Sequence, residues 1–256
     1  MVEGLQIGSV DVSAIGSAPL GGIYEPMFQA LDLPFLWSSR EQVAKVLDGP
    51  IGRELMKKLE GKGLKALTFG GGYGFRNMMS NKRAIVTPDD MRGQTIRVQE
   101  SPTYIALMKA LGANPIPLPM PEVYLAMKQG TVDGMDQPAV GAVADHFYEV
   151  AKFYSITRHA YSPIVYLMST KAYESLGELK PVIDEAAAAA RAVHRKADAD
   201  KEQGAFETMR KAGVQINEVK DLKAFQDRMT PVYQAVAAKA GKEFVDRVVA
   251  AAAAAR

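Results

Sequence analysis

The sequence predicts an α/β protein built from strand-helix-strand units. Two such units follow one another between residues 95 and 137, where short runs of β-forming residues alternate with segments of helical periodicity. The alanine-rich segments, 14 prolines and 22 glycines also fit this class better than a helical bundle or a β-sandwich. A chain of 256 residues is long enough for one large domain or two modest ones, each with its own core.

The first third of the chain predicts strands around two helices. "LQIGSVDVSAIGSA" alternates apolar and small residues, which is typical of a strand that leads to a Gly/Ser turn. Ser39 is a candidate N-cap for a helix whose apolar face is Val43, Val46 and Leu47. Leu55 and Leu59 begin a second helix that Gly61 and Gly63 are expected to end. "LKALTF" is a candidate for a buried strand.

The glycine-rich stretch "GGGYG" follows that strand. Three consecutive glycines between ordered segments suit a flexible hinge or a phosphate cradle. No Lys-Ser/Thr pair follows and no helical pattern opens there, so the sequence favours the hinge.

The regular pattern begins at Thr95. It consists of the strand "TIRVQES", a helix that Pro102 opens and Gly112 ends, the extended "NPIPLP", the helix "PEVYLAMKQG" and the strand "TVDGMDQ". Such crossovers are right-handed and imply a parallel sheet, with ligands beyond the carboxyl ends of its strands. Arg97, Asp136 and Gln137 lie near such ends.

The remaining elements are simpler to predict. "SPIVYLMST" is a strand candidate, and a long helix is expected from about residue 181 to residue 212. A short strand, "VQINEV", and a C-terminal helix through the alanine-rich end complete the chain.

Charge and composition exclude several classes of partner. The 31 Lys and Arg residues against 29 Asp and Glu give a net charge of +2 without a basic block, so neither nucleic acid nor an anionic membrane surface is indicated. No apolar run reaches the length of a membrane span, so we expect no direct membrane insertion. The N-terminal residues have neither the basic nor the apolar region of a signal peptide. The expected partner is a small molecule.

Motifs for metal or covalent chemistry are missing from the sequence. It contains no cysteine, and His146, His159 and His194 lie in unrelated segments without metal-ligand spacing, so surface or core roles are expected for them. There is no G-x-S-x-G nucleophile motif. We therefore expect no cofactor, no metal and no catalytic residue.

Arg97 is the most informative single residue. Its guanidinium carries five donors in a fixed fork, and its same-face neighbours Thr95 and Gln99 carry no charge. Either Arg97 is solvated on an open strand face, or it binds a carboxylate through two parallel charge-assisted hydrogen bonds.

Five motifs in order resemble one family. "LDLPFLW", "VLDGPIGREL", "IVTPDDMRGQTIRV", "ALGANPIPLPMPEVYLAMKQGTVDGMDQP" and "YEVAKFYSITRH" are similar, in sequence and spacing, to the extracytoplasmic solute-binding proteins of TRAP transporters, the DctP family. The resemblance covers essentially the whole chain. It implies a two-domain, periplasmic-binding-protein-like (Venus flytrap) fold with long linking helices. It also implies a periplasmic protein that captures an organic acid, such as a dicarboxylate, and delivers it to a TRAP membrane permease.

The resemblance also implies domain limits. Residues 1–74 with about 163–202 would form domain I, and residues 75–162 with about 203–256 would form domain II. Relative to the family, the chain begins about fifty residues into the mature protein, on the scale of one strand-helix-strand unit. We therefore expect an N-terminally truncated chain, without the signal peptide and that first unit, and an incomplete domain I.

Candidate binding residues follow from the same motifs. Arg97 occupies the place of the arginine that forms a bidentate salt bridge with the substrate carboxylate, and Arg76 occupies that of a second, assisting arginine. Gln137 stands where the family commonly has a ligand-binding asparagine. Met120 takes the place of a bulky pocket-wall residue, although a core role is equally expected.

Three further candidates rest on position alone. Glu100 would orient Arg97 or bind a ligand hydroxyl or amine, unless it is solvated. Phe75 and Ser17 are weaker candidates, from the hinge and the first-domain loop.

Two alternative functions keep the same pocket. An enzyme acting on a small carboxylate would need a positioned acid or base beside Arg97, and no motif supplies one. A ligand-sensing domain would differ only in its partner, and the sequence contains no motif of an output module, which mildly favours the binding protein. A non-enzymatic binding protein is therefore the leading prediction.

Overall fold

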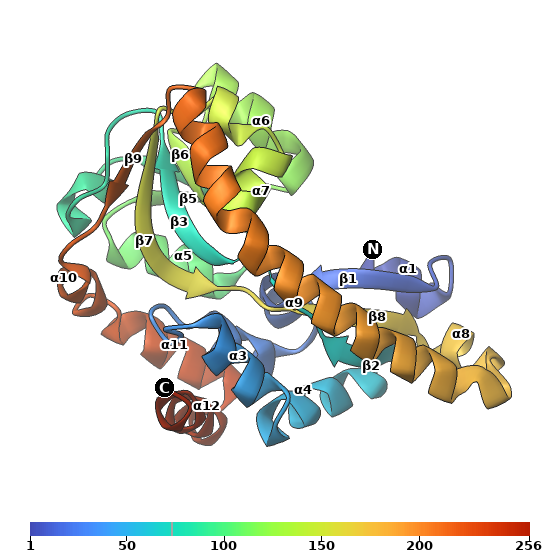
Figure 1. Ribbon diagram of the computed structural model, residues 1–256. Coiled ribbons are helices and arrows are strands. Elements are labelled where there is room, and N and C mark those ends of the chain that lie inside the picture. Colours follow the sequence, from blue (N-terminus) through green and yellow to red (C-terminus); the bar gives the residue numbers. More distant parts are fainter. Residues whose placement is uncertain (73) are drawn as a thin grey trace.

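A computed structural model of the chain describes residues 1–72 and 74–256. It contains two α/β parts, each built on one sheet (Figure 1). The first sheet has the order β1-β8-β2, in which β8 is antiparallel to both neighbours. Its strands are β1 (Val12–Gly16), β2 (Leu64–Phe69) and β8 (Ile164–Ser169).

The second sheet is mixed and has the order β5-β4-β6-β3-β7-β9. β4 is parallel to β5 and β6, β7 is parallel to β9, and β3 is antiparallel to β6 and β7. Its strands are β3 (Phe75–Ser80), β4 (Thr95–Val98), β5 (Asn114–Pro117), β6 (Gly134–Pro138), β7 (Phe153–Tyr161) and β9 (Gln215–Glu218). The sequence analysis did not predict β3 and β7.

The two predicted strand-helix-strand units are confirmed. They run from β4 through α5 (Pro102–Ala110) to β5, and from β5 through α6 (Met120–Gln129) to β6. β5 is the edge strand of this sheet, which explains why it tolerates prolines that cannot donate to a neighbour. The parallel pairing places the carboxyl ends of β4 and β6 at one edge.

The predicted strand over "LQIG" is wrong. Residues Val2–Ile7 form helix α1, in which Val2 and Leu5 are buried, and the strand begins only at Val12. Gly8 adopts a left-handed conformation with φ of 77°, which ends the helix at little steric cost. The alternation of small and apolar residues therefore did not distinguish a one-and-a-half-turn helix from a strand.

The two predicted helices that follow are confirmed. α3 (Arg40–Leu47) begins at Ser39, whose Oγ accepts a hydrogen bond from the backbone N–H of Gln42 at 3.1 Å. α4 (Pro50–Glu60) ends at Gly61. Between β1 and α3 the chain forms three short turns of helix: α2 (Ser17–Pro19), η1 (Leu20–Tyr24) and η2 (Pro26–Asp32).

The long helix α9 (Lys180–Lys211) spans both parts, as predicted (Figure 1). It holds the connection between β2 and β3. Arg195 donates to the backbone carbonyls of Phe69 and Gly70, each at 3.2 Å, and Asp198 accepts from the backbone N–H of Gly72 at 2.9 Å. The described part of the glycine-rich stretch is thus anchored to the helix that joins the two parts, and the expected hinge stays a prediction. Tyr73 lies outside the described residues.

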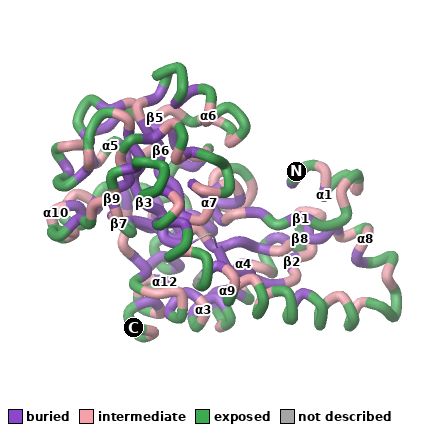
Figure 2. The backbone as a smooth tube through the Cα atoms, turned by 45° about the horizontal axis from the view of Figure 1, so that its top comes forward, coloured by how far each residue is buried: buried purple, intermediate pink, exposed green. Residues whose placement is uncertain are grey.

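Three apolar clusters form the interior, and Figure 2 shows the buried strands beneath largely exposed helices. One fills the first part, and the other two cover the opposite faces of the second sheet. The remaining helices are α7 (Ala139–Ala144), α8 (Thr170–Ser175), α10 (Leu222–Gln226), α11 (Thr230–Ala240) and α12 (Lys242–Ala254), with 3₁₀ turns η3 (Pro88–Met91), η4 (Phe147–Glu149) and η5 (Gly177–Leu179).

The C-terminal helices pack mainly into the first core. Val236, Phe244 and Val248 belong to the cluster that contains Leu31 and Leu55. The sequence analysis placed this segment in domain II. We therefore propose a division in which residues from about 230 onward accompany domain I. In the described part of the chain, no helix combines the length and apolarity that a bilayer crossing requires.

Two glycines give matched tests of this packing. A Cβ on Gly134, in β6, would lie 2.1 Å from the carbonyl oxygen of Met79 on β3, whereas one on Gly204, in α9, meets nothing within 4 Å. We expect Gly134→Ala to destabilise the protein by about 2 kcal/mol or more, because β3 and β6 must move apart to make room for the added methyl group. Gly204→Ala should stabilise it by about 0.8 kcal/mol through helix propensity. Urea unfolding measures both, and equal midpoints for the two variants would contradict the register of β3 on β6.

Candidate ligand-binding site

Arg97 is buried in the middle of the second sheet. It lies on β4 between β5 and β6, and only 4% of its surface is exposed, which excludes the solvated interpretation. Its Nε and Nη2 donate to the backbone carbonyl of Leu118, at 2.9 and 2.7 Å. Among the described residues, Nη1 has no hydrogen-bond partner and the guanidinium has no ion pair. One edge of the fork is therefore held by the protein, and Nη1 remains available.

The position of Leu118 follows from the proline-rich edge strand. Leu118 comes directly after β5, and its backbone N–H donates to the carbonyl of Val98 at 3.3 Å. Pro117 and Pro119 on either side restrict the backbone to extended conformations. The carbonyl that orients Arg97 is thus fixed by the chain itself.

Arg76 is the second buried arginine. It lies on β3, is 5% exposed, and forms an ion pair with Asp136 of the neighbouring strand β6. Nε and Nη2 both contact the carboxylate, Nη2 with Oδ1 at 3.1 Å, and Nη2 also donates to the backbone carbonyl of Asp136. The guanidinium lies over the ring of Tyr104 at 5.3 Å. Its Nη1 has no hydrogen-bond partner in the described part of the chain.

Electrostatics distinguishes the two arginines. Burial, and then the charge of Arg76, lowers the pKa of Arg97 to about 10. Burial would also lower the pKa of Arg76, but the charge of Asp136 outweighs it and the net shift is upward. Burial alone would raise the pKa of Asp136, yet Arg76 and a hydrogen bond from His159 bring it below its ordinary value. Arg76 thus has a direct counterion, whereas Arg97 forms no ion pair with any described residue.

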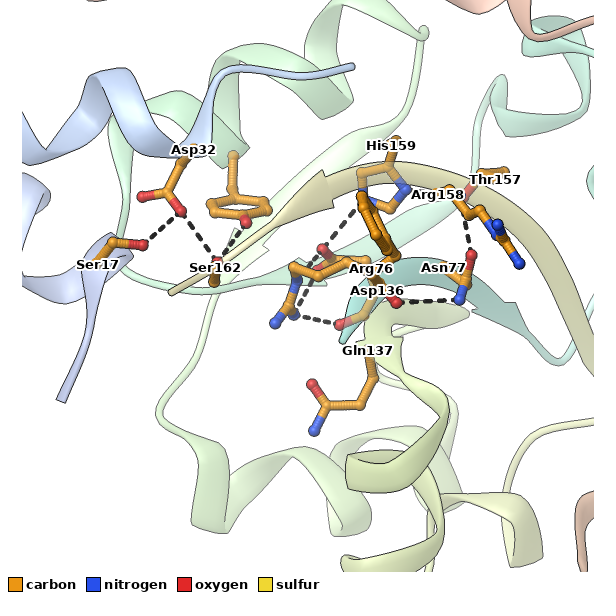
Figure 3. A network of polar contacts seen from close by, with 12 residues as sticks. Ser17, Asp32, Arg76, Asn77, Asp136, Gln137, Thr157, Arg158, His159 and Ser162 are labelled. Carbon is orange, nitrogen blue, oxygen red and sulfur yellow. Dashed lines mark hydrogen bonds and ion pairs between the residues drawn. The ribbon is translucent and has the colours of Figure 1, made fainter. Parts of the chain in front are cut away.

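Polar side chains on β3 and β7 form a hydrogen-bond network with this ion pair and with the backbone of β6 (Figure 3). His159 on β7 lies 3.2 Å from Oδ2 of Asp136, and its other ring nitrogen bonds Thr157 at 2.8 Å. Asn77 donates to Tyr154, whose hydroxyl in turn donates to the backbone carbonyl of Gln137 at 2.9 Å. These bonds fix the backbone of β6 where it presents Asp136 and Gln137.

Asn77 also stabilises an irregularity in the sheet. The pairing of β3 with β7 shifts between Arg76 and Met78, and Arg158 has a φ of 44°, which is unusual for a residue other than glycine. The side-chain oxygen of Asn77 accepts the backbone N–H of Arg158 at 2.9 Å. The β-bulge therefore positions Arg76 and His159 on the same buried network.

A second polar group joins the first part to the second. Oδ1 of Asp32, at the end of η2, accepts hydrogen bonds from Ser17 at 2.8 Å and from Ser162 at 3.0 Å. Ser162, in the connection from β7 to β8, also bonds the hydroxyl of Tyr104 on α5 at 2.7 Å. Burial raises the pKa of Asp32 to about 7, although the Ser17 and Ser162 bonds oppose the shift.

The other predicted residues lie at different depths. Gln137 is 4% exposed, projects from the ion-pair network (Figure 3), and lies 3.4 Å from Asp145. Phe75 packs edge-to-face on Tyr161 at 5.2 Å and is part of the first core. Met120 is half-buried at the start of α6 and packs on the second part's core.

The predicted residues therefore gather only in part. Arg76, Arg97 and Gln137 are buried at the carboxyl edge of the parallel strands. Ser17 lies in the first part, where its hydroxyl donates a hydrogen bond to Asp32. The side chain of Glu100 is exposed. The described residues contain no cluster of histidine and carboxylate side chains placed to hold a metal ion.

Sequence reasoning missed several members of the networks. Asp32, Tyr104 and Ser162 were not candidates, and His159 was assigned to the surface or core. The motif "LDLPFLW" contains Asp32 among apolar residues, and an acidic residue in such a run was the available signal.

Two α/β parts joined by several crossings are the architecture of a two-domain binding protein, and Arg76 and Arg97 are buried in the second part. Residues 1–240 match the family described as bacterial extracellular solute-binding protein, family 7 (DctP), and the chain belongs to this family. This confirms the resemblance to TRAP solute-binding proteins. Because that family consists of binding proteins, it also confirms the prediction of a binding protein rather than an enzyme.

Relatives and solved structures agree with this assignment. The chain is 36% identical over 230 residues to the 2,3-diketo-L-gulonate-binding periplasmic protein of Escherichia coli, covering 90% of this chain and 70% of the relative. A sugar acid binding protein of Advenella mimigardefordensis in complex with galactonate has a TM-score of 0.96 at 33% identity, covering 100% of this chain and 83% of the other. A TRAP periplasmic solute binding protein of Sulfurospirillum deleyianum with bound succinate has a TM-score of 0.91 at 29% identity, covering 96% and 82%.

These matches confirm the predicted two-domain α/β fold of periplasmic binding proteins. The chain spans 66% of an uncharacterised Haemophilus influenzae relative, to which it is 36% identical.

The ion pair of Arg76 predicts a stability effect. We expect Asp136→Asn to destabilise the protein by about 3 kcal/mol at neutral pH, because it leaves a buried guanidinium without its counterion. The pKa of Asp136 is lowered in the folded state, so its contribution is present above its ordinary pKa near 3.8 and is lost as the pH falls further.

Urea unfolding of the wild type and the variant at pH 7.5 and pH 3.5 measures this effect. The difference between the two proteins should shrink at the lower pH. Asp89→Asn removes an exposed carboxylate that also pairs with arginine, and is the matched control. A loss no larger than that of the control would show that Asp136 does not carry the charge balance.

Proposed function

We propose that this protein binds the carboxylate of an organic acid through Arg97 and Arg76, and delivers the acid to a TRAP-type membrane permease. The observation that carries the proposal is the pairing of two buried guanidinium groups. Each has its Nε and Nη2 bonded to the protein, and each leaves Nη1 without a partner among the described residues. A carboxylate has two oxygens and four lone-pair sites, so one group serves both arginines.

The charge balance supports an anionic ligand. Asp136 neutralises Arg76, whereas the one hydrogen-bond partner of Arg97 among the described residues is the uncharged carbonyl of Leu118. Burial without a counterion lowers the pKa of Arg97, and a bound carboxylate would offset that penalty. The charge of the ligand therefore completes the site.

The relatives support an organic acid as the ligand. The matched structures contain galactonate and succinate, and the matched E. coli protein is named for 2,3-diketo-L-gulonate. These compounds share a carboxylate and differ in the rest of the molecule. Gln137, which is buried on β6 next to Asp136, would contact that variable part.

The names of the relatives also support the location and partner. They are called periplasmic, and several matched structures are TRAP solute-binding proteins. We infer that this chain acts in the periplasm and passes its acid to the permease subunits of such a transporter, after the two parts close around it by bending at the glycine-rich connection.

Conservative replacement of Arg97 tests the contact. Arg97→Lys keeps the charge but loses the fork, so the affinity for an organic acid should fall by about 2 kcal/mol, roughly 30-fold. Calorimetric titration of wild type and variant with a panel of organic acids measures this. Arg83→Lys, an exposed arginine of the same part, is the control and should bind as the wild type does. An unchanged affinity in a folded Arg97→Lys protein would remove Arg97 from the site.

A further inference from the structure

Three buried polar atoms after strand β4 have no hydrogen-bond partner among the described residues. They are Nε2 of Gln99, Oγ of Ser101 and Oγ1 of Thr103. Ser101 and Thr103 are 0% and 1% exposed. Ser101 stands at the N-cap of α5, yet its hydroxyl does not cap the helix. Because an unmade buried hydrogen bond costs about 1–3 kcal/mol, these groups are candidates for ligand contacts.

The first part of the protein faces these groups with an unpartnered acceptor. A Cβ on Gly22 would lie 2.5 Å from the carbonyl of Glu100, so the two segments are in close contact. Asp32, also in the first part, is fully buried. Its Oδ1 is bonded to Ser17 and Ser162 (Figure 3), but its Oδ2 has no partner in the described part of the chain.

Asp32 belongs to the same cluster as the arginines. Ser162 connects it to Tyr104, whose ring lies under the guanidinium of Arg76. The charged and titratable groups that influence Asp32 are Arg76, Asp136 and Tyr104. Asp32 is therefore connected to Arg76 through Ser162 and Tyr104, and the start of α5 contacts the first part at Gly22.

The donors and acceptors that lack a partner indicate which chemical group of a ligand would fit them. Nε2 of Gln99 can only donate, the hydroxyls of Ser101 and Thr103 donate or accept, and ionised Asp32 can only accept. A second ligand carboxylate would suit the donors but face the charge of Asp32. An ammonium group would suit Asp32 but not Gln99. A hydroxyl group satisfies both kinds of partner.

The following inference rests on the proposed carboxylate site. We propose that Asp32 is a specificity-determining residue that accepts a hydrogen bond from a hydroxyl of the bound acid. Gln99, Ser101 and Thr103 bond the neighbouring hydroxyls. The protein therefore selects polyhydroxylated monocarboxylates and rejects dicarboxylates.

Calorimetric titration with two probes, D-galactonate and succinate, tests this selection. The wild type should bind galactonate at least 10-fold more tightly than succinate. Asp32→Asn should weaken galactonate binding at least 10-fold and reduce the preference, because it removes the charge that repels the second carboxylate. Asp11→Asn, which replaces an exposed acid of the first part, should behave as the wild type does.

Thr103→Val provides an independent variant of nearly the same shape. It should weaken galactonate binding and leave succinate binding unchanged, and it tests the inference even where Asp32→Asn does not fold. The pH gives a further readout. Since burial raises the pKa of Asp32 to about 7, galactonate affinity should increase from pH 5.5 to pH 8 as the acceptor ionises, and this increase should be absent in Asp32→Asn.

The possible outcomes distinguish a failure of this inference from a failure of the proposed function. A wild type that binds succinate as tightly as galactonate, or an unchanged ratio in both variants, overturns the role of Asp32 while Arg97-dependent binding stands. If wild type and Arg97→Lys bind neither probe nor any other organic acid, the proposed function itself fails.

Discussion

The burial of two like charges beside each other is the constraint on which the site depends. Arg76 and Arg97 are close enough for the charge of one to lower the pKa of the other, and both are almost fully removed from water. Such an arrangement is costly unless each charge is compensated. Asp136 compensates Arg76 directly. Among the described residues Arg97 has hydrogen bonds to a carbonyl but no ion pair, and only the more distant charges of Asp136 and Glu100 oppose the effect of its burial.

The rest of the fold holds this arrangement in place. Asn77 and Tyr154 fix the backbone of β6, and the β-bulge opposite Asn77 places His159 against Asp136. Ser162, in a crossing between the parts, bonds groups from both. The long helix α9 anchors the glycine-rich connection. A change in the separation of the two parts would alter these contacts together, which gives ligand binding a physical route to domain closure.

Local signals predicted much of the fold and less of the site. Ser39, Gly61 and Pro102 marked helix ends correctly, and periodicity identified α9 and both strand-helix-strand units. β3 was missed because all six of its residues are buried, polar ones included, so it shows no alternation. Asp32 was missed because its partners, Ser17 and Ser162, lie 15 and 130 residues away. Contacts of that kind depend on the tertiary structure, which no local pattern contains.

A crystal structure with a bound organic acid tests the central claim most directly. We predict that one carboxylate lies between the two arginines, with its oxygens about 3 Å from Nη1 of Arg97 and Nη1 of Arg76. The bonds from Arg97 to Leu118 and from Arg76 to Asp136 should persist. A ligand carboxylate bound away from both guanidinium groups, with neither Nη1 in contact with it, would contradict the account.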